Sequence, residues 1–213
     1  MTVSKKLAQV AFVLSAALPV AAFAGDTGTV YTQIGTGGFG IGYGMSVDKD
    51  WAVRGQFNTI PSQSFTGDVG DFGSGSKLDL KLVWTSVNLV GDWYPSDGSF
   101  RLTGGVILNS SKVTIAGTGQ VNNKPATINS EIKFSDGVSP YLGIGYGTRP
   151  KDAAGFGFNF DLGVSFNNPT STLSATGAGV VQADIDAQKK KVDEAISNLK
   201  TLPVFGIGIS YSF

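Results

Sequence analysis

The sequence contains no cysteine and no histidine among its 213 residues. Without cysteine, the chain can form neither a disulfide framework nor the lipid-bearing end of a lipoprotein. Without histidine, it lacks the commonest general base and the commonest neutral metal ligand, and a Ser–His catalytic pair is excluded. We therefore expect no enzymatic activity, no bound metal and no cofactor.

An excess of charge of either sign is also missing, since basic and acidic residues number 16 each. Residues 1–24 hold two lysines and no acid, so the remainder carries 14 basic and 16 acidic side chains. A nucleic-acid-binding protein would need a basic patch or stripe. We expect no nucleic-acid partner.

The first 24 residues have the pattern of a secretory signal peptide. Lys5 and Lys6 precede an apolar run over residues 7–20, and Ala22-Phe23-Ala24 is a small-x-small cleavage site. The alternative is a membrane anchor, but the run is shorter than the roughly 20 residues that a spanning helix needs. No later segment resembles a transmembrane helix. We expect residues 1–24 to be removed and residues 25–213 to form the exported protein.

Glycine, in contrast, is abundant, with 30 residues, near twice the average usage of about 7%. In residues 38–47 the glycines alternate with large apolar residues, namely Phe39, Ile41, Tyr43, Met45 and Val47. Successive side chains of a strand point to opposite faces of the sheet. One face of this strand is therefore large and apolar, and the other is almost bare.

The same alternation recurs in residues 51–57, 100–108, 141–148, 156–166 and 205–213. A soluble β-sandwich alternates as well, but its polar face meets water and seldom consists of glycine. A barrel in lipid places its apolar face outward and its polar face in the lumen, and closure satisfies every backbone group in hydrocarbon. We therefore predict an all-β transmembrane barrel in the bacterial outer membrane, in contact with its lipid and lipopolysaccharide.

Alternation and turn residues together predict eight antiparallel strands in up-and-down order. They are residues 29–35, 38–47, 51–58, 85–94, 100–109, 140–148, 155–166 and 203–213. Because bacterial barrels combine short periplasmic turns with long outer loops, we expect extracellular loops near 59–77, 110–138 and 167–202.

The last of these loops contains apolar residues at helical spacing. They are Val181, Ile185, Gln188, Val192, Ala195 and Leu199. We predict a helix here, which either packs on the outer ends of the strands or lies across the barrel mouth as a lid.

The hairpin around residues 94–99 changes character along its length. We expect Trp93 to lie opposite Phe100, and Asp92 opposite Arg101. Higher up, apolar residues occupy the inward parity: Leu78, Leu80, Leu82, Trp84, Val113 and Ile115. Either the hairpin rises above the membrane and turns an apolar face over the barrel mouth, or a β-bulge resets the phase.

Eight charged or amide side chains fall on the inward parity of the predicted strands. They are Arg54, Gln56, Asn58, Asn88, Asp92, Arg101, Asn159 and Asp161. Because buried charges must be paired, one interpretation is a network that fills and stiffens the barrel. The other is a polar path for small solutes. A catalytic pair of Asp92 and Asp161 is conceivable, but salt bridging explains both carboxylates.

At the end of the final strand, every second residue is apolar, so these residues share one face: Phe205, Ile207, Ile209, Tyr211 and Phe213. This pattern resembles the signal read by the outer-membrane barrel assembly machinery, which we expect to be a partner. Several other stretches, in order, resemble the carbapenem-associated outer-membrane protein group. They are residues 33–40, 92–95, 98–102, 140–147 and 160–164, the Asp/Lys-rich helical segment that runs into residues 202–204, and the ending Ser-Tyr-Ser-Phe.

The resemblance implies an eight-stranded barrel and a proposed role in uptake of small basic amino acids such as ornithine. No substrate-binding residue can be matched, and the terminal Phe213 differs from the Trp of some members. Two functional hypotheses follow. The first is a narrow or gated channel for small polar solutes; the alternative is a structural or surface-interaction barrel with a plugged lumen.

Overall fold

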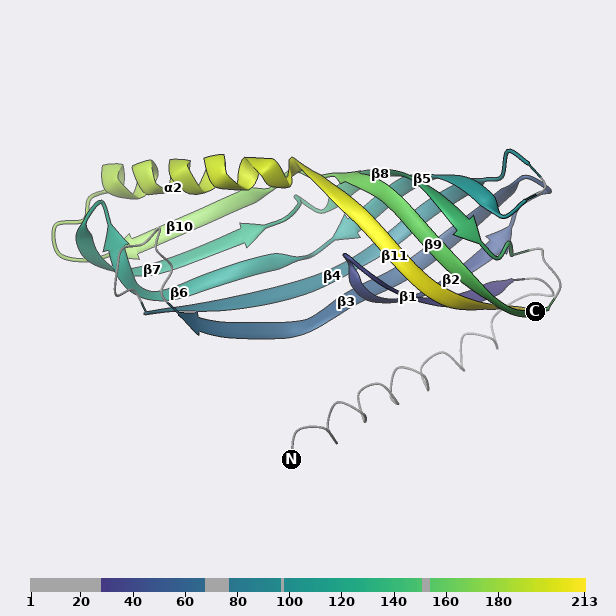
Figure 1. Ribbon diagram of the computed structural model, residues 1–213. Helices are drawn as coiled ribbons and strands as arrows, with labels where there is room; N and C mark the ends of the chain where they lie inside the picture. Colours follow the sequence, from purple (N-terminus) through teal and green to yellow (C-terminus); the bar gives the residue numbers. More distant parts are fainter. Residues whose placement is uncertain (1–27, 68–76, 97, 151–153) are drawn as a thin grey trace, which may run out of the picture.

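The computed structural model describes residues 28–67, 77–96, 98–150 and 154–213. The predicted signal peptide lies outside these residues. The fold is elongated, with a closed barrel at one end and a smaller extension of strands and one helix at the other (Figure 1). No helix in the described ranges is both long enough and apolar enough to cross a membrane.

Eight antiparallel strands form the barrel. They are β1 (Thr29–Gly35), β2 (Gly38–Ser46), β3 (Trp51–Gly67), β4 (Lys77–Trp93), β5 (Phe100–Asn109), β8 (Val138–Gly147), β9 (Gly155–Phe166) and β11 (Thr201–Ser212). They follow one another in the order β4-β3-β2-β1-β11-β9-β8-β5, and β5 pairs again with β4 to close the ring. The predicted all-β barrel of eight strands is confirmed.

Three further strands continue the sheet beyond the barrel. They are β6 (Lys112–Val121), β7 (Lys124–Lys133) and β10 (Thr170–Thr176). β6 pairs with the upper half of β4, β7 with β6, and β10 with β7. Helix α2 (Gln182–Ile196) and the short helix η3 (Ser197–Lys200) follow, and α2 lies along β10 (Figure 1).

The segments expected as loops are therefore largely regular structure, and β3 itself runs on to Gly67. A tight turn at Asn122 and Asn123 explains the β6–β7 hairpin, because both residues have positive φ, 50° and 62°. Such left-handed pairs form the two-residue turns that suit the twist of a hairpin, and asparagine tolerates them better than most residues.

The predicted register of the β4–β5 hairpin is wrong by two residues. Trp93 lies opposite Leu102, and Asp92 lies opposite Thr103 rather than Arg101. The chain leaves the β4–β5 ladder after Trp93 because the Tyr94 backbone N–H donates to the carbonyl of Asp50, 2.8 Å away, in another turn. The same offset persists higher up, where Leu80 lies opposite Ile115.

The apolar upper half of β4 belongs to the extension. Its even-numbered residues stay on one face, with Asp92 in the lumen and Leu78 in a separate apolar core. This core also contains Ile115, Val121, Ala126 and Ile128, with Val192 of α2 packed against it. The hairpin thus continues beyond the barrel, and its apolar face packs against α2. A bulge does occur, but in β3 at Ile60/Gln63.

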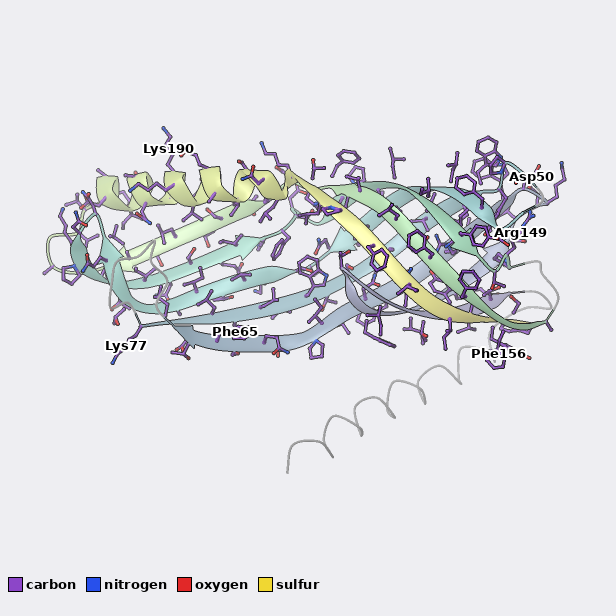
Figure 2. All side chains as sticks on the ribbon, viewed as in Figure 1. Asp50, Phe65, Lys77, Arg149, Phe156 and Lys190 are labelled. Atoms are coloured by element: carbon purple, nitrogen blue, oxygen red, sulfur yellow. The ribbon has the colours of Figure 1, made fainter. Side chains whose placement is uncertain are left out.

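The two faces of the barrel wall differ as the alternation predicted. Large apolar side chains point away from the barrel, with Ile209 65% exposed and Phe156 87% exposed (Figure 2). Gly40, Gly42 and Gly44 of β2 are buried on the inner face. The wall therefore has an apolar outside and a narrow inside.

The predicted helix exists, and it packs against β10 and β6. Its inner face is formed by Asp184, Gln188 and Ile196, which are buried, while Val181 and Ala195 of the expected stripe are exposed. Lys190 points away from the sheet on the opposite side of the helix (Figure 2).

Candidate functional site: an ion-pair cluster across the lumen

Four charged side chains meet inside the barrel. Arg54 Nη2 lies 3.1 Å from Asp161 Oδ1 and 3.0 Å from Asp92 Oδ1, and Arg54 Nε also contacts Asp92. Arg101 Nη2 donates to Asp161 Oδ1 at 2.8 Å, and its Nε lies 3.6 Å from Asp92 Oδ1. We call Arg54, Asp92, Arg101 and Asp161 the lumen quartet. Its two positive and two negative charges balance.

The quartet crosses the full width of the barrel. Arg54 comes from β3 and Asp161 from β9, and in the closed ring these strands are four positions apart in either direction. Asp92 is 0% exposed and Arg101 is 1% exposed. The ion pair between Arg54 and Asp161 therefore joins opposite walls, and the lumen is filled at this height.

Glycine on the inner face makes room for these long side chains. A methyl group on Gly145 of β8 would lie 2.6 Å from Arg101 Nε and 2.8 Å from Asp161 Oδ1. Contacts this short between such atoms cannot be accommodated without moving one of them. The absence of a side chain at Gly145 thus allows the guanidinium of Arg101 to lie against β8.

Amides extend the network along the lumen. Gln33 donates to Asp161 Oδ2 at 2.8 Å, and Gln56 donates to Gln33 at 2.9 Å and to Asn58 at 2.6 Å. Asn58 in turn donates to Ser86 at 3.4 Å. The predicted Gln56 and Asn58 thus lie in one hydrogen-bonded chain that leads from the quartet toward the extension.

Sequence reasoning did not include Gln33 or Thr103. Gln33 bonds the carboxylate of Asp161, and the hydroxyl of Thr103 donates to Asp92 Oδ1 at 2.7 Å. Both residues have the inward parity of their strands, so the alternation itself could have identified them.

The remaining predicted residues, Asn88 and Asn159, face inward without joining the quartet. Asn88 Oδ1 and Asn159 Nδ2 are buried and make no hydrogen bond to any described residue. Asn88 lines a cavity of about 310 Å³ whose floor includes Arg54 and Asp161 and whose wall includes Trp84. The cavity lies between the quartet and the extension.

A buried arginine connects turns at the opposite end of the barrel. Arg149, in the turn after β8, donates to the carbonyl of Lys49 at 2.6 Å and to that of Gly98 at 3.4 Å. Its guanidinium carbon lies 4.5 Å from the centre of the Tyr94 ring. Arg149 is 4% exposed, and it lies near Asp50 at this end (Figure 2). Arg149 thus connects its own turn with the turns that contain Lys49 and Gly98. No sequence motif predicts this role.

The start of helix α2 is bound to the extension through a buried carboxylate. Asp184 accepts hydrogen bonds from Lys124 Nζ at 2.6 Å and Asn122 Nδ2 at 2.7 Å, and from the Val181 backbone N–H at 3.2 Å. These hydrogen bonds, that of Lys124 first, lower the pKa of Asp184 to about 2. The start of the helix is thereby fixed to the β6–β7 turn.

The lumen offers little for acid–base chemistry. Both aspartates of the quartet are engaged by arginines, and a general base must be within reach of a substrate proton. Among the residues that the structure describes, no group of three or more His, Cys, Asp or Glu side chains is placed to hold a metal ion. The geometry is that of paired buried charges.

Comparison with known proteins supports the fold. Neither the family models nor the curated proteins searched contain a match. Among solved structures, CarO of Acinetobacter baumannii matches with 21% identity and a TM-score of 0.55, covering 88% of this chain and 97% of that one. CarO2 of the same organism matches with 16% identity and a TM-score of 0.57, covering 88% and 98%. The resemblance found in the ordered motifs is thus confirmed at the level of the fold, and this chain shares the barrel fold of CarO.

Proposed function

We propose that this chain is an exported, non-enzymatic barrel protein of the bacterial outer membrane, with its lumen shut by the quartet. The observation that carries the proposal is the Arg54–Asp161 ion pair between opposite walls, in a barrel whose outside is apolar.

Support for a membrane location comes from the outer surface. The exposed residues of β11 include Phe205, Ile207, Ile209 and Tyr211, and an outward apolar band is what a barrel presents to lipid. β9 and β11, with 12 residues each, exceed the roughly 9–11 residues that a tilted strand needs to cross a bilayer. We take outer-membrane lipid, lipopolysaccharide and the assembly machinery as the partners, the last reading the outward apolar residues of β11.

Support for a closed lumen comes from burial. A solute passing through would have to separate Arg101 from Asp161, or Arg54 from both aspartates. Removing one partner of a buried pair typically costs about 3–5 kcal/mol because the other charge is left unpaired. A structural barrel is therefore favoured over an open pore.

A gated channel for small polar solutes is the second candidate. The cavity of about 310 Å³ favours a channel, because it reaches the quartet from one side and is partly lined by polar side chains. Passage would require either Arg54 to leave both aspartates or Arg101 to leave Asp161.

Conductance in planar bilayers tests both candidates. We expect the wild-type protein to give no current steps, and the charge-neutral double variant Arg54→Ser/Asp161→Ser to conduct small ions. The matched control is Lys189→Ser/Asp193→Ser, which removes a partly exposed pair of α2 outside the lumen and should stay silent. Steps from the wild-type protein would contradict the closed lumen. Recovery of the chain outside the outer-membrane fraction of cells would contradict the location.

A further inference from the structure

The barrel wall is incomplete on one side. β1 has seven residues and ends at Gly35, which pairs with Gly206 of β11 and Gly38 of β2. Beyond this turn, residues 201–205 of β11 pair with β9 alone among the described strands, and β3 beyond Thr59 pairs with β4 alone. β1 and β2 end well short of β3 and β11 (Figure 1). We call the missing wall above turn 35–38 the notch.

If the barrel lies in the membrane as proposed, the short β1 places the notch within the thickness of the hydrocarbon layer. A tilted strand needs roughly 9–11 residues to cross the hydrocarbon, and β1 has seven. The β11 side of the notch is apolar, since Phe205 is 41% exposed and Phe166, on the neighbouring β9, is 45% exposed. On the β3 side, the polar residues 62–64 are exposed. The β11 side is therefore the one that offers a hydrocarbon chain an apolar surface.

The cavity lies directly behind the notch. Turn 35–38 and residues 202–206 of β11 both line it. Its lining is mixed: Trp84, Leu202 and Val204 are apolar, the floor contains Arg54 and Asp161, and Ser165, which pairs with Leu202, is polar. An amphiphile, with one polar and one apolar part, matches such a lining.

The polar end of the ligand should be uncharged. The quartet is already balanced, and an added ion would leave an uncompensated charge in a buried site. Asn88 Oδ1 lines the cavity as a buried acceptor without a partner among the described residues, so a hydroxyl or amide N–H would satisfy it.

We propose that the cavity binds an uncharged amphiphile, with its hydroxyl-bearing head beside Asn88 and its hydrocarbon chain leaving through the notch into the lipid. This inference rests on the proposed membrane location. The volume of about 310 Å³ is at the lower end of ligand pockets, about 300–1,000 Å³. It holds the head and the first part of a chain, and the rest stays in the notch.

Trp84 supplies the probe. The double variant Trp51→Phe/Trp93→Phe leaves Trp84 as the single tryptophan of the three in the chain. In phosphatidylcholine vesicles, a brominated monoacylglycerol should quench Trp84 to saturation, and the unbrominated compound should reverse the quenching. Quenching that rises linearly, without saturation or reversal, would overturn the proposal.

Two variants of β11 make a matched pair in this background. Val204→Phe adds a ring inside the cavity and should weaken binding at least about tenfold, because bulk there displaces the ligand. Ile209→Phe adds the same ring on the outer face, where Ile209 is 65% exposed, and should change nothing. Asn88→Leu should weaken binding by roughly tenfold through loss of one hydrogen bond. Equal binding by all variants would contradict the site.

A second single-tryptophan variant distinguishes failure of this inference from failure of the proposed function. The variant Trp84→Phe/Trp93→Phe leaves Trp51, which is 49% exposed on the outer face of β3. Brominated phosphatidylcholine should quench Trp51 if the barrel is inserted. Failure of that quenching contradicts the membrane location; quenching of Trp51 without saturable quenching of Trp84 contradicts only the amphiphile site.

Discussion

Arg101 of β5 and Asp161 of β9 are 60 positions apart in the chain, and their side chains meet at 2.8 Å in the middle of the barrel. Arg54 and Asp92 complete the group from two further strands. Every charge of the quartet thus depends on a strand other than its own for its partner. The stability of the barrel and the closure of its lumen depend on the same contacts.

Replacing one carboxylate of the quartet should destabilise the barrel strongly. In Asp161→Asn, two arginines share the single carboxylate of Asp92, so we expect the free energy of unfolding to fall by about 3–5 kcal/mol. Urea unfolding in lipid vesicles, followed by tryptophan fluorescence, measures this. Asp186→Asn on the exposed face of α2 should stay within about 0.5 kcal/mol of wild type. Equal values for both variants would argue against a structural role of the quartet.

Adding one methyl group beside the quartet should also be costly. Gly145→Ala places it 2.6 Å from Arg101 Nε, and overpacking of this kind typically costs about 1–3 kcal/mol. Gly91→Ala is the matched control, because the nearest atom to its methyl group is the Gly104 carbonyl oxygen at 3.9 Å. The same unfolding measurement should separate the two variants, and similar losses for both would contradict the packing described.

The medium around the barrel can be tested by charge. Ile209 and Phe65 have nearly the same exposure, 65% and 61%, but Ile209 lies on the barrel and Phe65 on the extension (Figure 2). Ile209→Arg should cost about 2–4 kcal/mol in folding into vesicles, as charges facing hydrocarbon do. Phe65→Arg should cost little. Comparable costs would mean that both residues meet the same medium.

Acid should release the start of α2. The pKa of Asp184 in the folded chain, about 2, lies below its ordinary 3.8. Asp184 therefore contributes its full stabilisation above about pH 4 and loses it as the pH falls through 2. A nitroxide on Ala187→Cys, an exposed position in the first half of α2 and the single thiol of the chain, should become mobile over this interval in electron paramagnetic resonance spectra.

The variant Asp184→Asn isolates this effect. Hydrogen bonds from Lys189 first and Ser171 second also lower the pKa of Asp193, farther along the same helix. In Asp184→Asn we expect a more mobile label already at pH 7, with only the smaller change due to Asp193 remaining at low pH. An unchanged pH profile would show that Asp184 does not fix the helix.

Strands and faces of the barrel could be predicted from the sequence because a period of two residues is a local property. Residues 29–35, 100–109 and 155–166 were predicted with the bounds that the structure has. The β4–β5 register could not be predicted, since it depends on a bond from Tyr94 to Asp50 in a distant turn. Turn composition alone carries no information about that contact.

The extension shows a different limit. Ala126 and Ile128 alternate with polar residues in β7, and this pattern was available in the sequence. Residues 110–138 are nevertheless expected to form a loop, because bacterial barrels have long outer loops. Charged residues of the lumen were predicted from their inward parity, whereas Arg149 was not, because its partners are mainly backbone carbonyls and one ring. Every residue has a backbone carbonyl, so these partners of Arg149 cannot be recognised from the sequence.

β4 pairs with β5 over its lower half and with β6 over its upper half, as one uninterrupted strand of 17 residues. Barrel and extension are consequently not modules that can be cut apart at a loop. Excising residues 110–138 would strip one edge of β4 and uncover Leu78, so a shortened chain would have to end β3 and β4 earlier as well. A binding peptide grafted onto the β6–β7 turn would, for the same reason, be mechanically tied to the barrel wall.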